Sequence, residues 1–216
     1  MKFIENTKAY LGQRAITTYR KKNKRQVKAC NINNAKTIGI LFNATHQISF
    51  EIVKEMVKNL SVRKNKIDVL GYVDSKNLID HYLYRKGFEF FTRKQLNWYY
   101  KPVDEFVNIF IEKKFDILIN LSLDEPYPIQ YIAALSKAKF KVGKYSKENE
   151  YLDFMIDIKK EKEALKSLNQ EIHKEKKEAK HRNKEVEKLV DVRAQTEIEL
   201  NFLITHLLHY LSLIKN

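Results

Sequence analysis

The middle of the chain alternates between short apolar segments and longer segments in which apolar residues recur every three or four positions. The short β-branched and apolar runs predict strands buried on both faces, and the longer periodic runs predict helices. Strands are expected at residues 37–42, 67–73, 88–91, 115–122, 139–145 and 151–158. Helices are expected between them, at about 48–60, 78–83, 102–114 and 126–136.

Strands that alternate with helices of this length predict an α/β fold. Right-handed crossovers would build a three-layer α/β/α Rossmann-like sandwich with a mainly parallel sheet of five or six strands, in the order 3-2-1-4-5. We expect three parts. They are a basic N-terminal helical segment (1–36), the Rossmann-like domain (37–158), and a charged helical arm that ends in a core helix (159–216).

The C-terminal part changes character along its length. Lys and Glu dominate residues 159–193, where a heptad trace of apolar residues is too thin for a strong coiled coil. From residue 199 a wide apolar stripe predicts a helix that packs on the sheet. The charged section would then project from the domain, and self-association or a protein partner through 159–216 is the alternative.

Charge adds a second feature. The chain has 41 Lys and Arg against 27 Asp and Glu, a net charge of +14, and the excess is concentrated in residues 1–36. Such a run attracts nucleic acid or another anionic surface, although it can also be a solvated segment. The cations are Arg14, Arg20, Lys21, Lys22, Lys24, Arg25 and Lys28. Apolar residues at helical spacing in 3–19 predict a helix that packs on its own domain, lies on a membrane or docks on RNA.

A second basic segment interleaves cations with aromatic residues. Arg93 and Lys94 are followed by Trp98, the combination that binds a phosphate backbone while stacking bases. The alternative is that Trp98 anchors this long connection against the core.

Polar residues follow the first and fourth predicted strands. In open α/β sheets, ligands bind beyond the carboxyl ends of the strands at this switch point. The candidates are Asn43, Thr45, His46, Ser122, Asp124 and Glu125. His46 is a candidate base or phosphate ligand, and the two carboxylates are a candidate acid/base pair. The alternative is a surface histidine and a helix start whose acidic residues complement the helix dipole.

Motifs for an enzyme are missing. The chain has no G-x-G-x-x-G, no P-loop and no G-x-S-x-G, and its His and Cys residues lack zinc-ligand spacing. We therefore expect no cofactor and no metal, and an enzyme is disfavoured. Cys30 is the only cysteine, the N-terminus lacks a signal-peptide pattern, and residues 200–214 are too short and polar to span a bilayer. These features predict a cytoplasmic protein.

Three short segments carry a resemblance. Residues 96–98 (Leu-Asn-Trp), 115–120 (Phe-Asp-Ile-Leu-Ile-Asn) and 136–143 (Ser-Lys-Ala-Lys-Phe-Lys-Val-Gly) together resemble an uncharacterised family of short bacterial α/β proteins, a domain of unknown function. The resemblance spans roughly residues 10–158 and the final helix. It implies a compact cytoplasmic domain with a basic N-terminal segment and no assigned activity, and it makes 159–193 an extension beyond the usual family length.

The chain is also similar, more weakly, to the N-terminal lobe of heptosyltransferase-like glycosyltransferases. The similarity rests on an apolar strand with a polar turn and a helix, and on the strand at 138–143. Those enzymes need a second Rossmann lobe, whereas helix alone is expected here after residue 158, so this chain is not expected to transfer a sugar by itself.

These observations predict a non-enzymatic module that docks on an anionic partner, with RNA or the ribosome preferred. An anionic membrane surface is the second choice of partner. The alternatives are a nucleotide-binding or phosphosugar-binding protein, a degenerate glycosyltransferase-like lobe, or an adaptor that uses its helical arm.

Overall fold

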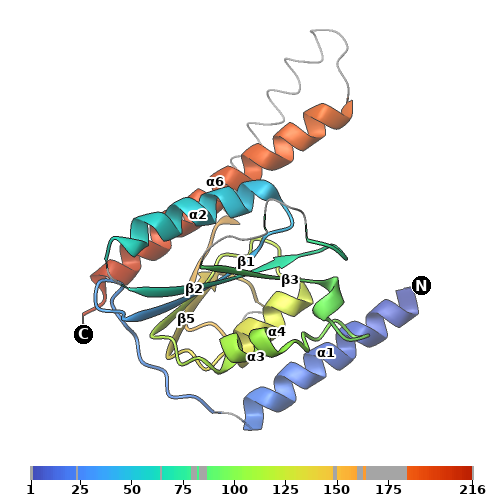
Figure 1. Ribbon diagram of the computed structural model, residues 1–216, viewed down its shortest axis with the longest axis horizontal. Helices are drawn as coiled ribbons and strands as arrows, with labels where there is room; N and C mark the ends of the chain where they lie inside the picture. The colour runs from blue at the N-terminus through green and yellow to red at the C-terminus, as the bar shows by residue number, and fades with distance from the viewer. Residues whose placement is uncertain are drawn as a thin grey trace.

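A computed structural model describes residues 2–22, 24–63, 65–78, 82, 87–147, 150–159, 163 and 184–215. Its centre is a six-stranded sheet in which every strand pairs in parallel with its neighbour (Figure 1). The order β3-β2-β1-β4-β5-β6 confirms the predicted Rossmann-like order and adds the sixth strand at the edge. The strands are β1 (Thr37–Asn43), β2 (Lys66–Val73), β3 (Phe88–Thr92), β4 (Ile117–Asn120), β5 (Phe140–Lys144) and β6 (Phe154–Ile156).

The central strands are buried on both faces, as their apolar runs predict. In β1, Ile38 pairs with Ile67 of β2 and with Ile117 of β4, and Ile38 and Ile117 are fully buried. Strands β4, β5 and β6 are shorter than their apolar runs. The flanking residues Leu121 and Leu152 are buried but do not belong to a strand. Their apolar side chains therefore indicated burial, not strand pairing.

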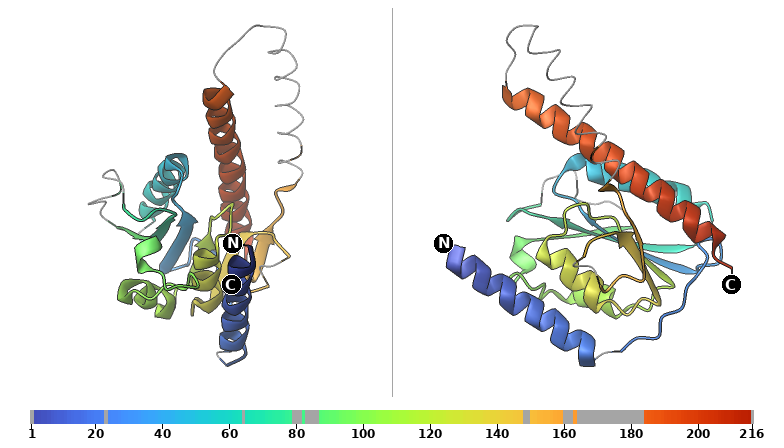
Figure 2. Two further views of the ribbon diagram at one scale, coloured as in Figure 1. Left: turned by 90° about the vertical axis from the view of Figure 1, so that its right-hand side faces the viewer. Right: turned by 180° about the vertical axis from the view of Figure 1, so that it is seen from behind.

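Two layers of helices cover the sheet (Figures 1 and 2). Helices α2 (Gln47–Ser61) and α6 (Lys184–Leu213) share one hydrophobic core, and α3 (Glu105–Glu112) and α4 (Tyr127–Leu135) share the other. Helix α3 begins later than predicted because Pro102 is held in an antiparallel bridge with Leu96. Most of the helix predicted at 78–83 lies outside the described residues.

The N-terminal helix α1 (Lys2–Lys22) packs on its own domain, beside α4 (Figures 1 and 2). Helix α4 is apolar on nearly every side, so it needs cover on its outer face as well as on the face toward the sheet. Ile16 of α1 is buried in that core. Gly12 allows the close approach, since a Cβ there would lie 2.4 Å from a ring carbon of Tyr127.

The final helix is continuous with part of the predicted charged arm. Its apolar stripe from Leu200 to Leu211 is buried against the sheet and α2, as predicted. Its beginning extends beyond the sheet (Figure 1), and residues 164–183 of the predicted arm lie outside the described part of the chain. Among the helices that the structure describes, none combines the length and hydropathy that crossing a membrane requires.

Because all six strands run in parallel, the sheet has two chemically distinct ends. We call the end where the strands begin the amino edge and the end where they finish the carboxyl edge. The loops that precede the strands meet at the amino edge, and the loops that follow them meet at the carboxyl edge.

Candidate functional site

The amino edge carries a lysine at the start of four neighbouring strands. Lys36 precedes β1, Lys66 begins β2, Lys114 lies three residues before β4, and Lys139 precedes β5. All four side chains are exposed. Neighbouring strands lie about 4.8 Å apart, so the four strand starts span about 14 Å in the order β2-β1-β4-β5. Parallel topology thus turns one lysine per strand into a line of positive charge.

A pocket of about 920 Å³ opens at the β5 end of this line. Its cations are Arg20, Lys24, Arg25, Lys28, Lys114, Lys137, Lys139 and Lys141, and its carboxylates are Glu150 and Asp153. The cations come from the end of α1, from the segment after it, and from the starts of β4 and β5. Four residues of the predicted basic run, Arg20, Lys24, Arg25 and Lys28, are therefore gathered in one concave surface.

The segment after α1 is fastened across the amino edge. The backbone N–H of Lys28 donates to the carbonyl of Lys139 over 3.0 Å. Arg25 donates to the carbonyls of Ala138 and Lys139 at 3.2 and 3.0 Å and forms an ion pair with Asp153. Arg25 therefore holds the segment in place, and its charge is already matched by a carboxylate.

Lys141 is the buried cation of the pocket, with 1% of its surface exposed. Its Nζ donates to the carbonyls of Ala133 and Ala134 at 2.8 and 3.0 Å, which satisfies the carbonyl end of α4. Burial, with a smaller effect from Arg25, lowers the pKa of Lys141 to about 7. A neutral amine has two N–H donors, and the two carbonyls accept both. Lys141 thus acts as a helix cap.

The other pocket cations fall into paired and free groups. Lys139 lies 2.8 Å from Asp116 and Lys137 lies 2.5 Å from Glu112. Arg20 lies 3.8 Å from the Glu150 carboxylate and donates to the Glu150 carbonyl at 3.0 Å. Within the described part of the chain, Lys24, Lys28 and Lys114 have no ion pair. These three exposed side chains are free to bind an external anion.

Asp116 organises the centre of the amino edge. Its carboxylate accepts the backbone N–H groups of Lys36 and Thr37 at 2.9 and 3.1 Å in addition to the Lys139 ammonium. Burial by itself would raise the pKa of Asp116, but these donors outweigh it and hold the pKa near 2. The β1 start is thereby tied to the lysine that precedes β5.

The other predicted cations lie outside this pocket. Arg14 and Lys21 are exposed on α1, and the side chain of Lys22 lies outside the described residues. Arg93 and Lys94 follow β3, so they belong to the carboxyl edge, and the two predicted basic sets do not meet. Trp98 does not anchor its loop, because it is 63% exposed and contacts Tyr99, while Leu96 packs on the core.

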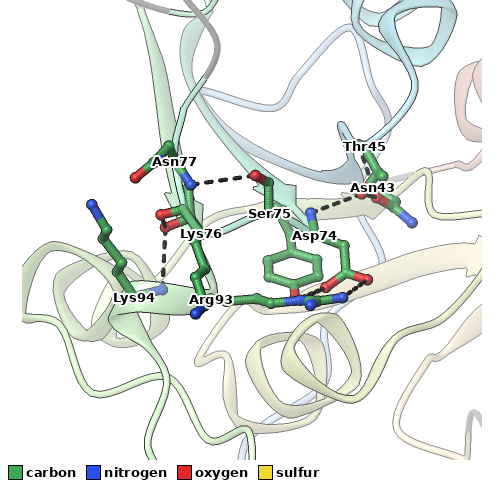
Figure 3. Close-up of polar contacts among 10 residues, drawn as sticks. Asn43, Thr45, Asp74, Ser75, Lys76, Asn77, Arg93 and Lys94 are labelled. Atoms are coloured by element: carbon green, nitrogen blue, oxygen red, sulfur yellow. Dashed lines mark hydrogen bonds and ion pairs between the residues drawn. The ribbon is translucent and has the colours of Figure 1, made fainter.

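At the carboxyl edge, polar side chains and Arg93 form a network of hydrogen bonds (Figure 3). The Thr45 hydroxyl donates to the Asn43 side-chain oxygen at 2.6 Å and accepts the N–H of Asp74 at 2.9 Å. Asp74 receives Nε and Nη2 of Arg93 at 2.6 and 2.8 Å and the Tyr72 hydroxyl at 2.7 Å. The Arg93 guanidinium holds the pKa of Asp74 below its ordinary value. Arg93 is therefore occupied within the protein.

Three residues of the predicted ligand crevice line a small cavity. Asn43, His46 and Asp124 line a cavity of about 160 Å³ that α6 closes with Val192, Gln195, Thr196 and Glu199. Thr45 is used in the turn, and Ser122 is buried with its hydroxyl donating to the Asp124 carbonyl at 2.5 Å. The Glu125 carbonyl accepts a hydrogen bond from Gln130. Typical small-molecule sites start at about 300 Å³, so this cavity suits only a very small ligand.

The predicted site omitted the lysines that precede the strands. The signal was in the sequence: Lys36, Lys66, Lys114 and Lys139 each stand at the start of a predicted strand. Lys137 and Lys141 flank the last of these. All of these lysines belong to one site because the strands run in parallel and because the segment after α1 returns to the amino edge.

Comparison with known proteins agrees with the resemblance seen in the sequence. A model of a family of unknown function (DUF6913) matches residues 8–174, well over half of the chain. The match runs past residue 158, so residues 159–174 lie within the family rather than beyond it. Neither a curated protein nor a solved structure matches the chain, and the similarity to heptosyltransferase-like lobes is not shown. The chain belongs to the DUF6913 family of unknown function.

Proposed function

We propose that this protein is a non-enzymatic module that binds the phosphate backbone of RNA along its amino edge. The observation that carries the proposal is the convergence of free lysines from separate parts of the chain. Lys24 and Lys28 follow α1 and Lys114 precedes β4, yet all three line one pocket. Phosphate contacts of this kind supply most of the sequence-independent affinity of nucleic-acid-binding proteins.

The length of the basic surface favours a polyanion over a single phosphate. The lysines at the strand starts continue from the pocket to Lys66 over about 14 Å. A chain of phosphates can contact this whole line, whereas one phosphate group contacts only part of it. Exposed Arg14 and Lys21 extend the same charge along α1.

A nucleotide or phosphosugar in the pocket is the second candidate, because a volume of about 920 Å³ is in the range of small-molecule sites. Membrane anchoring has less support. It would use the apolar residues of α1, but Ile16 is buried against α4 and Leu11 is half-buried.

The test measures RNA affinity by fluorescence anisotropy with a labelled RNA hairpin. The variant is K28E/K114E, and the matched control is K76E/K94E, two exposed lysines of the carboxyl edge with the same change in net charge. We expect K28E/K114E to weaken binding by about 100-fold and to reduce the salt dependence, with a much smaller loss in the control.

Equal losses in the two variants would contradict the proposal, because they would reflect net charge rather than a site. If the wild-type protein binds no RNA but is stabilised against heat by a nucleotide, and K28E/K114E abolishes that effect, the second candidate replaces the first.

A further inference from the structure

We infer that the RNA recognised at the amino edge is double-helical rather than single-stranded. This inference rests on the proposed function and concerns the form of its ligand. Proteins bind single strands by stacking bases on exposed aromatic side chains, whereas they bind duplex RNA through its shape and its phosphate and ribose groups. The two modes therefore require different side chains around the basic surface.

The aromatic side chains of the pocket are not placed for stacking. Among the described lining residues, they are Tyr19 and Tyr151. Tyr151 is only 6% exposed, and Tyr19 is half-buried against the core under α3 and α4. An unpaired base entering the pocket would meet cations and backbone instead of an open aromatic face.

The exposed aromatic residues of the described chain lie outside the pocket: Tyr10 is on α1, Tyr210 is near the end of α6, and Trp98, Tyr100 and Tyr145 follow strands at the carboxyl edge. Trp98 and Tyr100 are 63% and 40% exposed, in the connection that follows β3. Strand β2 alone has 8 residues, so the two edges are roughly 25 Å apart along the strands. A single strand held by the amino-edge lysines would need about four further extended nucleotides to reach this aromatic pair.

The cation array is built on rigid supports. Lys139 is fixed by its ion pair with Asp116, and the segment carrying Lys24 and Lys28 is tied to the start of β5 by Arg25 and by the backbone. The spacing of the lysines is therefore set by the sheet. A duplex presents phosphates at regular spacing without further ordering, whereas a single strand must lose conformational freedom to match the same array.

The experiment compares two labelled RNAs of equal length and equal charge per strand, a hairpin with a stem of about 16 base pairs and an unstructured oligonucleotide, at one salt concentration. We expect the hairpin to bind at least about tenfold more tightly than the single strand. Trp98→Ala should leave both affinities unchanged, and K28E/K114E should abolish the preference.

The outcomes separate the inference from the proposed function. If the single strand binds as tightly as the hairpin, or if Trp98→Ala weakens binding, the double-helix inference is wrong while RNA binding stands. If neither RNA binds more tightly to the wild type than to K28E/K114E, the proposed function itself fails.

Discussion

The two edges of the sheet are built from the same topology but carry different chemistry. At the amino edge, a lysine stands at the start of four strands, and the segment after α1 adds Lys24 and Lys28. At the carboxyl edge, Asn43, Thr45, Asp74 and Asp124 follow the strands, Arg93 forms an ion pair with Asp74, and Lys76 and Lys94 are exposed. Parallel pairing collects one residue per strand at each edge. The two edges therefore gather different sets of side chains.

Of the two cavities described above, the larger lies at the amino edge. Open α/β sheets generally bind ligands at the carboxyl edge. Here the carboxyl-edge cavity holds about 160 Å³, and the pocket at the amino edge holds about 920 Å³. The fold alone would direct a search for a ligand site to the carboxyl edge, whereas the proposed function uses the amino edge.

Each edge has one arginine–aspartate pair, and breaking each pair compares their structural roles. Arg25→Met removes the ion-pair partner of a carboxylate that is 15% exposed and takes one donor from each of the Ala138 and Lys139 carbonyls, so we expect a loss of about 2 kcal/mol in the free energy of unfolding. Arg93→Met breaks a pair that is about half exposed and should cost less than about 1 kcal/mol. Urea denaturation of both variants measures the difference. Equal losses would mean that the segment after α1 is not fastened as described.

Lys141 makes the amino edge sensitive to pH. The folded protein releases the Lys141 proton near pH 7, whereas the unfolded chain keeps it to about pH 10.5. The unfolded state thus binds more protons between these values, and the free energy of unfolding should rise by about 1–2 kcal/mol from pH 7 to pH 9. Lys141→Met should remove this rise in urea denaturation. An unchanged pH profile in the variant would show that Lys141 is charged in the folded protein.

The sequence predicted the elements well and the site only in part. Apolar runs such as 37–42 and 115–122 specified buried parallel strands because strands covered on both faces have no polar side. The basic run was visible, but not its location, because that depends on Arg25 reaching Ala138 and Asp153 far along the chain. Burial of Lys141 was equally hidden. Lys141 lies within β5, and its side chain is buried because it reaches the carbonyl end of α4, which the sequence around it does not indicate.

Asp116 at the amino edge and Asp124 at the carboxyl edge should contribute differently to the stability of the protein in acid. The Asp116 carboxylate accepts four donors at the amino edge, so Asp116→Asn should lower the free energy of unfolding by about 1 kcal/mol at neutral pH. Its pKa is lowered to about 2, so the stability it contributes is present above pH 3.8 and lost as the pH falls toward 2. Exposed Asp124 at the carboxyl edge should tolerate Asp124→Asn within about 0.5 kcal/mol. Acid titrations followed by circular dichroism test both, and matching acid transitions in Asp116→Asn and the wild type would refute the assignment.

The smallest effect is expected for the two strand-start lysines that lie farthest from the pocket. Lys36 and Lys66 are exposed at the starts of β1 and β2, outside the pocket. Changing both lysines to Gln should weaken RNA binding by about three- to tenfold. The slope of log affinity against log salt concentration should fall by the amount expected for the loss of up to two phosphate contacts. Anisotropy titrations over a range of salt concentrations measure this. No change would confine the binding surface to the pocket.

The most direct test of the central claim is the protection of individual lysines from acetylation, measured by mass spectrometry with and without the RNA hairpin. We predict that the hairpin protects Lys24, Lys28 and Lys114 at the amino edge and leaves Lys76 and Lys94 at the carboxyl edge as reactive as in the free protein. Protection of Lys76 and Lys94 with no change at the amino edge would contradict the account.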